Sequence, residues 1–324
     1  MENFHLMNKI IQERFHYAEL CHESACFAGV LSSLSVSRGT RVIIYMPMVP
    51  ELPVAMLACA RLGLVHSVIF GGFSADAIRD RVNDAGARVV ITADGSWRRG
   101  RVIPLKATVD SALAENACPT VETVVVLKRC ENDVDWNDDR DVWWDQAIDG
   151  QSDVCPPVHL PAEHPLYILY TSGTTGKPKG SELTHANLFL NCAVVVPRLI
   201  EGYAPDSVAL ATLPLFHSFG QTVIQNGTLA AGGTYTLLPR FDPQGAFEVM
   251  ERDRVTIFAG VPTMYFALLH LDSARGYDLS SLRTCMTGGA PMPVEVMGAF
   301  EKKFGVEVQE GFGLSETSPV ASFG

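Results

Sequence analysis

The residues best suited to chemistry lie in one run at residues 170–180, with the sequence YTSGTTGKPKG. This run offers hydroxyl groups, lysine ammonium groups, and glycines that let a ligand approach the backbone closely. Exposed backbone N–H groups and ammonium groups are what a polyphosphate requires. The apolar residues 167–170 predict a strand before the run, and a helical segment is expected from Thr184. We therefore expect a phosphate-binding loop here rather than a surface turn.

The spacing within this run differs from that of the Walker loop, G-x-x-x-x-G-K-[ST]. Gly173 and Gly176 are only three positions apart, and Pro178 follows Lys177 where the Walker loop has serine or threonine. An ordinary P-loop kinase or GTPase is therefore excluded by the spacing.

Apolar runs of strand length alternate with helical patterns along most of the chain, which predicts an α/β fold with mostly parallel sheets and right-handed crossovers. Ser74 is expected to cap one helix at its N-terminus, and Gly86 is expected to end that helix. The expected strands are 41–45, 66–70, 88–93, 166–170, 208–213, 234–238, 255–259 and 283–286. The expected helices are 50–63, 75–85, 184–199, 244–254, 262–270 and 293–304.

A polar and proline-rich stretch at residues 130–165 interrupts this alternation. It predicts a boundary between two α/β sub-lobes, residues 1–155 and 156–324. The acidic residues that follow Cys130 are expected to form a solvated face.

The composition limits the classes of function. The formal net charge is −11, and 47% of the 324 residues are hydrophobic. A nucleic-acid partner is not expected, because such proteins usually present a basic face. No apolar run approaches the ~20 residues of a membrane span. The eight cysteines lack metal-ligand spacing, which is typical of reduced thiols. Without a signal sequence, we expect a cytoplasmic protein, with peripheral membrane contact left open.

Four further segments accompany the phosphate loop, and with it they resemble the motifs of the adenylate-forming (AMP-dependent synthetase/ligase) superfamily, which includes the acyl-CoA synthetases. The similarity extends over nearly the whole chain. It implies two α/β sub-lobes of the family's N-terminal domain, with ATP, Mg²⁺ and coenzyme A as cofactors and a carboxylic acid as substrate. The four segments are RGTRV at 38–42, LPLFH at 213–217, GGAPM at 288–292 and GFGLSET at 311–317.

The resemblance also assigns roles to individual residues. Phe312 is expected to stack on adenine, with Gly289, Ala290 and Pro291 on its other side. The β- and γ-phosphates are assigned to Thr171, Ser172, Gly173, Thr174, Thr175, Gly176 and Lys179.

Four residues are expected to act in catalysis: Thr174, Lys179, Ser315 and Glu316. The Ser315 hydroxyl would lie near the α-phosphate, and Glu316 would bind Mg²⁺, which needs few protein oxygen ligands beside phosphate. Taken alone, Glu316 would be read as a surface carboxylate.

The acyl pocket is assigned to Phe216, His217 and Gly313. His217 is expected to line or gate the pocket rather than transfer a proton, because the carboxylate substrate is already ionised near neutral pH. Gly313 takes the place of a tryptophan that closes the pocket in short-chain enzymes. We read Gly313 as leaving that space open, which favours medium- or long-chain acids.

The two sub-lobes resemble different branches of the family. Residues from about 39 to 148 are most similar to acetyl- and propionyl-CoA synthetases, and residues from about 166 onward to medium- or long-chain fatty acyl-CoA ligases. A natural mosaic and a made chimera both account for this. The first branch places Arg98 and Arg101 near the nucleotide of coenzyme A; the alternative is a solvated basic turn.

The family continues beyond the Ser-Glu motif with a small barrel and a C-terminal lid that supplies a further lysine. Because the chain ends at Gly324, we expect weak nucleotide binding and little complete turnover. An acyl-CoA synthetase is the leading interpretation. The alternatives are an adenylation domain that loads a carrier protein, and a non-catalytic nucleotide-binding fragment or pseudoenzyme.

Overall fold

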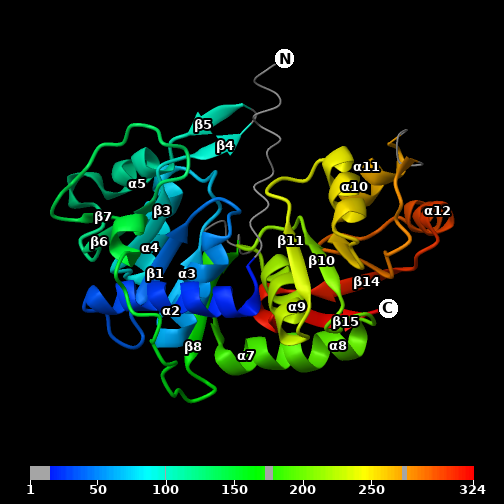
Figure 1. Cartoon of the computed structure of the whole chain (residues 1–324), viewed down its shortest axis with the longest axis horizontal. Coiled ribbons are helices and arrows are strands. Elements are labelled where there is room, and N and C mark those ends of the chain that lie inside the picture. The colour runs from blue at the N-terminus through cyan, green and yellow to red at the C-terminus, as the bar shows by residue number, and fades with distance from the viewer. Residues whose placement is uncertain (1–14, 99, 172–177, 272–275) are drawn as a thin grey trace. The chain divides into compact units, whose positions relative to one another are not determined.

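The computed structural model describes residues 15–98, 100–171, 178–271 and 276–324 (Figure 1). Its internal contacts divide the chain into two compact units, Met1–Leu160 and Pro161–Gly324. The sequence places the boundary nearby, after residue 155. Both units consist of sheets with flanking helices, which confirms the predicted α/β class.

The first unit is built on a parallel sheet in which five of its strands have the order β7-β6-β3-β1-β2. Each neighbouring pair of these strands is parallel. Ile43 and Val90, on the central strands, are fully buried, as expected for a sheet covered on both faces. The strands are β1 (Arg41–Tyr45), β2 (Val65–Val68), β3 (Val89–Ala93), β6 (Thr123–Leu127) and β7 (Asp141–Trp143).

Helices connect the strands of the first unit, and their ends follow from local residue types. The Ser74 hydroxyl accepts a hydrogen bond from the Ala77 N–H, and Gly63 and Gly86 end their helices with positive φ angles of 68° and 60°, where an L side chain would be strained. The helices are α2 (Tyr17–Ser33), α3 (Glu51–Leu62), α4 (Ala75–Ala85), α5 (Leu105–Leu113) and α6 (Trp144–Ile148), with a 3-10 turn η1 (Ala114–Asn116).

Several elements of the first unit were not among those expected from the sequence, including α2, α5 and β6. A two-stranded antiparallel ribbon of β4 (Ser96–Arg98) and β5 (Arg101–Ile103) follows β3. Strand β7 and helix α6 lie inside the polar stretch 130–165. That stretch is therefore only partly a solvated face: Asp139 is exposed, whereas the Asp141 side chain is fully buried beside Lys106.

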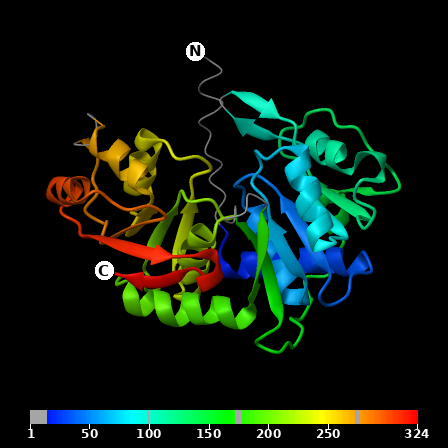
Figure 2. The same cartoon turned by 180° about the vertical axis from the view of Figure 1, so that it is seen from behind.

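The second unit contains a six-stranded sheet with the order β11-β10-β12-β13-β14-β15. All pairs are parallel except β14 with β15, which are antiparallel; these two strands, in red, lie side by side in Figure 2. The strands are β10 (Val208–Ala211), β11 (Thr234–Leu237), β12 (Ile257–Gly260), β13 (Thr284–Gly288), β14 (Val308–Gly313) and β15 (Val320–Phe323).

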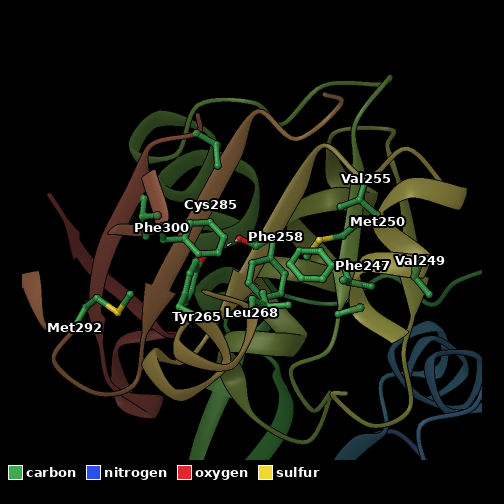
Figure 3. Packing of buried hydrophobic residues seen from close by; sticks show 14 residues of the cluster. Phe247, Val249, Met250, Val255, Phe258, Tyr265, Leu268, Cys285, Met292 and Phe300 are labelled. Carbon is green, nitrogen blue, oxygen red and sulfur yellow. Dashed lines mark hydrogen bonds between the residues drawn. The ribbon is translucent and has the colours of Figure 1, made fainter. Parts of the chain in front are cut away.

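Alternate residues of these strands enter two different cores. Leu210, Phe258 and Cys285 pack with α10 (Pro243–Arg252), α11 (Pro262–Leu269) and α12 (Val294–Phe304). Figure 3 shows the aromatic centre of this core, where the Tyr265 hydroxyl donates a hydrogen bond to the Phe258 carbonyl at 3.4 Å. The same hydroxyl also lies 2.6 Å from the Met286 carbonyl oxygen. The neighbouring residues Ala209, Ile257 and Met286 enter the second core, with α8 (Val196–Leu199) and η3 (Phe219–Asn226). Helices thus cover both faces of the sheet.

Two helical segments in this unit are π-helical. The predicted helix 184–199 is observed as α7 (His185–Leu190), the π-helix η2 (Asn191–Val195) and α8, which follow one line in Figure 1. The second π-helix, η3, leads into α9 (Gly227–Ala230). Such π-helical segments are frequent at functional sites.

The phosphate loop connects two antiparallel strands, β8 (Pro165–Thr171) and β9 (Lys179–Thr184). The sequence predicted a strand, a loop and then a helix, so β9 is an addition. Helix α7 starts only after it, with Thr184 as its N-cap in a capping box with Asn187. Among the described residues, no helix is long and apolar enough to cross a membrane.

Candidate functional site

The candidate site lies at one edge of the six-stranded sheet, where the parallel strands β10, β12, β13 and β14 have their carboxyl ends. The chain runs from β10 outward to β11 and then crosses to β12 on the other side of β10. Such a reversal of strand order is the position at which α/β sheets bind ligands. Three of the segments singled out in the sequence follow these strands: 213–217 after β10, 289–291 after β13, and 312–317 from the end of β14.

Phe312 and the segment Gly289–Pro291 are brought together by the strand register. Gly288 and Gly311 are partners in the parallel pair of β13 and β14, so the residues that follow them are neighbours. Phe312 is 63% exposed although it is a large apolar side chain. An exposed aromatic ring beside an exposed glycine-containing loop is a surface on which a flat base can stack.

Glu310 ties this loop to β14, a role that the sequence analysis missed. Its carboxylate oxygen Oε1 accepts a hydrogen bond from the Met292 N–H at 2.8 Å. Gly289 has a φ of +79°, and a Cβ at this position would meet only Val261, at 3.7 Å. The loop is therefore fixed to β14 at Met292, whereas the space beside Gly289 is largely open.

Ser315 and Glu316 lie on the 3-10 turn η5 (Ser315–Thr317). The Thr317 hydroxyl accepts from the Leu314 N–H at 2.9 Å, which holds the turn closed. Glu316 is exposed and Ser315 is partly exposed. Within the described residues, no group of three or more acidic, histidine or cysteine side chains could hold a metal ion. A Mg²⁺ ion at Glu316 would thus take most of its oxygen ligands from phosphate, which suits this cation.

The ends of the phosphate loop lie on the β8–β9 hairpin. Thr171 and Lys179 are partners in the last described pair of this hairpin, and Lys179 is exposed. Strand β9 contacts the turn η5, so the hairpin and the Ser315–Glu316 turn are adjacent. The predicted phosphate ligands Ser172, Gly173, Thr174, Thr175 and Gly176 lie outside the described residues.

His217 lies between β10 and η3, next to the partly exposed Phe216. Its Nδ1 accepts a hydrogen bond from the Phe219 N–H at 3.2 Å, which leaves the proton of the neutral ring on Nε2. The ring is accessible to water, yet enough protein surrounds it for desolvation to lower its pKa. His217 is therefore a neutral hydrogen-bond donor at neutral pH.

The interpretation of Gly313 as an opening is wrong. A Cβ at this residue would lie 2.2 Å from the Pro319 carbonyl oxygen and 2.9 Å from the Pro319 carbonyl carbon. The chain's own backbone therefore fills the space where a side chain would start. Gly313 is required by this close approach, and it gives no support for a longer acyl chain.

Arg98 and Arg101 lie in the first unit as Cα partners on the β4–β5 ribbon. Both are exposed, as is Trp97. The base of the ribbon is held by Asp94, a fully buried residue whose carboxylate accepts from the Gly95 N–H at 2.6 Å and the Glu131 N–H at 2.7 Å. The ribbon that carries the two arginines is thus anchored at its start by the buried Asp94.

Comparison with known proteins identifies relatives of this chain. Residues 7–324 match the family described as AMP-binding enzyme. The acetyl-coenzyme A synthetase of Chromobacterium violaceum is 46% identical over 289 residues, which are 87% of this chain and 44% of that protein. The acetyl-coenzyme A synthetase of Laribacter hongkongensis is 44% identical over 291 residues, 88% of this chain and 44% of that protein. The chain thus spans less than half the length of these relatives.

Proposed function

From the premise that this chain belongs to the AMP-binding enzyme family, we propose that it is the nucleotide-binding part of an enzyme that activates a carboxylic acid with ATP. The observation that carries the proposal is the meeting of Phe312, the loop 289–291 and the Ser315–Glu316 turn at one sheet edge, with the β8–β9 hairpin against that turn. This arrangement suits adenine at one end and phosphates at the other.

In the proposed reaction, a carboxylate oxygen of the acid forms a bond to the α-phosphorus of ATP. The bond from this phosphorus to the oxygen that bridges it to the β-phosphate breaks, and pyrophosphate leaves with the electron pair. No protein base is needed, because the acid is already ionised near neutral pH. The chain's task is to position the reactants and to neutralise charge.

The roles of the residues follow from their chemistry. Lys179 would balance charge on the leaving phosphates, and the Ser315 hydroxyl would donate a hydrogen bond to the α-phosphate. Glu316 would hold Mg²⁺, which neutralises phosphate charge when bound. His217 would present its Nε2–H to the acid or to the phosphates without giving up the proton. Thr174 keeps its expected place among the phosphate ligands.

The acid is proposed to be short, of about the size of acetate. Relatives named acetyl-coenzyme A synthetase align with most of this chain, and Gly313 gives no support for a longer acid, because the Pro319 carbonyl occupies its Cβ position. This replaces the preference for fatty acids that an open space at Gly313 would favour.

Coenzyme A is the proposed acceptor of the acyl group, in a step in which its thiol displaces AMP. Arg98 and Arg101 support this part, because guanidinium groups bind phosphate well, and coenzyme A carries three phosphates. Arg98→Ala and Arg101→Ala should each weaken coenzyme A binding and leave ATP binding unchanged. Arg198→Ala, which removes an exposed arginine of α8, serves as the control. Equal loss in all three variants would contradict this assignment.

Isothermal titration with adenosine sulfamates that carry acetyl, octanoyl or palmitoyl groups tests the reaction and the chain length together. These molecules mimic acyl-AMP and need no turnover. We expect binding of the acetyl compound to be at least as tight as binding of the longer ones. Tighter binding with increasing length would contradict the short-chain proposal. Binding of ATP without preference for any acyl sulfamate over plain adenosine sulfamate would favour a non-catalytic nucleotide-binding protein.

A further inference from the structure

Asn191 makes a contact that joins distant parts of the second unit. This residue is 5% exposed and is the first residue of the π-helix η2. Its Nδ2 donates to the carbonyl oxygens of Val320 at 3.0 Å and Thr317 at 3.4 Å. Its Oδ1 accepts from the Val320 N–H at 3.4 Å. The side-chain amide thus pairs with the main chain of Val320 in both directions and also reaches the end of the Ser315–Thr317 turn.

The contact provides a second connection between the β8–β9 hairpin and the Ser315–Thr317 turn. Lys179 begins β9, which runs directly into α7 and then to Asn191. From Asn191 the amide bonds lead to Thr317, at the end of the turn that carries Ser315 and Glu316. Because β9 also contacts that turn, the hairpin and the turn are joined at two places. A buried amide bonded at both ends fixes such a junction, because breaking it leaves buried polar groups unpaired.

We propose that Asn191 is a positioning residue that sets the distance between Lys179 and the Ser315–Glu316 turn, and hence the fit of Mg²⁺-bound triphosphate. The inference rests on the proposed function and deepens it. Asn191 is expected to affect the phosphate end of the ligand and not the adenine end, because Phe312 and the loop 289–291 are held by the register of β13 and β14 and by Glu310.

The informative variant is Asn191→Asp. It has nearly the same shape but cannot donate to either carbonyl, and it places a negative charge beside two carbonyl oxygens. The matched control is Asn187→Ala. Asn187 lies one helical turn earlier, and its side chain accepts from the Thr184 N–H at 2.9 Å in the capping box of α7. The control therefore weakens the same helical segment without touching the Ser315–Thr317 turn.

Isothermal titration with ATP plus Mg²⁺ and with AMP separates positioning from general loss of structure. We expect Asn191→Asp to lower the affinity for ATP with Mg²⁺ at least tenfold and to leave the affinity for AMP within twofold. Asn187→Ala should leave both affinities within twofold. Unchanged affinity for ATP with Mg²⁺ in Asn191→Asp, or equal loss for ATP and AMP, would overturn the inference. If the unaltered protein fails to bind ATP, the proposed function and the inference both fall.

A measurement on the unaltered protein covers the case in which Asn191→Asp does not fold. The Val320 N–H donates to Asn191, so its rate of hydrogen exchange reports on this contact. ATP with Mg²⁺ should slow that exchange at least threefold, and AMP should leave it unchanged. Equal protection by both ligands, or by neither, would count against a role for Asn191 at the phosphate end.

Discussion

Lys106 Nζ lies 2.8 Å from a carboxylate oxygen of Asp141, and both side chains are fully buried. Arg140 also bonds Asp141, from Nε to Oδ1 at 2.7 Å. Burial opposes ionisation of Asp141, but hydrogen bonds from Arg140 and Lys106 outweigh it, so that the pKa of this carboxyl lies below its ordinary value. The pair ties α5 to β7, which lies inside the polar and proline-rich stretch at residues 130–165.

The variant Lys106→Met keeps the volume of the side chain but removes its charge, so Asp141 loses one of its two cationic partners. Removing one member of a buried pair costs about 3 kcal/mol of the free energy of unfolding. All four tryptophans belong to the first unit, so denaturant titration followed by tryptophan fluorescence measures this unit alone. Arg88→Met, which breaks an exposed pair with Glu122, should have no measurable effect. Comparable losses in the two variants would refute the prediction.

Phe312→Ala should weaken the binding of ATP and of AMP by the same factor, because the ring is proposed to contact only the base. Stacking of a base on an aromatic ring contributes about 1–3 kcal/mol, which corresponds to a loss of affinity of about 5- to 150-fold. The control is Phe189→Ala on α7, since both phenylalanines are 63% exposed. Titration calorimetry gives both affinities, and an equal effect of the two substitutions would remove Phe312 from the site.

The two glycines Gly313 and Gly298 should respond to alanine in opposite ways. Gly298 lies inside α12, and a Cβ there meets no atom within 4 Å, so Gly298→Ala should stabilise the protein by about 0.5–1 kcal/mol. At Gly313 the new methyl group would collide with the Pro319 carbonyl. Gly313→Ala should therefore lower the thermal midpoint and weaken binding of ATP with Mg²⁺. Full stability and binding in Gly313→Ala would show that the backbone gives way freely.

His217 should titrate below the ordinary histidine pKa of about 6.5, because burial disfavours its charged form. The unfolded chain then binds more protons than the folded chain as the pH falls below that value. The contribution of neutral His217 to the stability of the folded chain is fully present above the unfolded-state pKa. It is lost as the pH falls toward the lower, folded-state pKa. Assigned NMR titration should give the low pKa. The loss of thermal midpoint between pH 7.5 and 5.5 should be smaller in His217→Gln than in the parent, and an equal loss in the two proteins would contradict the prediction.

Elements with clear end signals could be predicted from the sequence. Helix α4 has the predicted bounds because Ser74 and Gly86 supply local caps, and β1 agrees with the buried run 41–45. Strand β9 was missed because its residues are mostly polar, and its pairing with β8 depends on a partner beyond the loop. The π-helical turn that begins at Asn191 was also missed, and so was the contact of the Asn191 side chain with the main chain of Val320, which is distant in sequence.

For the candidate site as well, features set by the local sequence could be predicted, whereas features set by distant residues could not. The chemical types of Phe312, Ser315 and Glu316 could be recognised from their motif. That Phe312 lies near the loop 289–291 follows from the pairing of β13 with β14, and the order of strands in a sheet cannot be predicted from one sequence alone. The interpretation of Gly313 failed because the approach of the Pro319 backbone is set by the turn between β14 and β15.

The β8–β9 hairpin restricts how this chain can vary. Thr171 and Lys179 are cross-strand partners on either side of the phosphate loop, and the side chains of a strand alternate between faces with a period of two. A slip of β9 by one residue against β8 would move the buried Leu183 to the opposite face of β9. Over evolutionary time, and in any mutant library, position 183 should therefore stay apolar, because an apolar residue there holds Lys179 opposite Thr171.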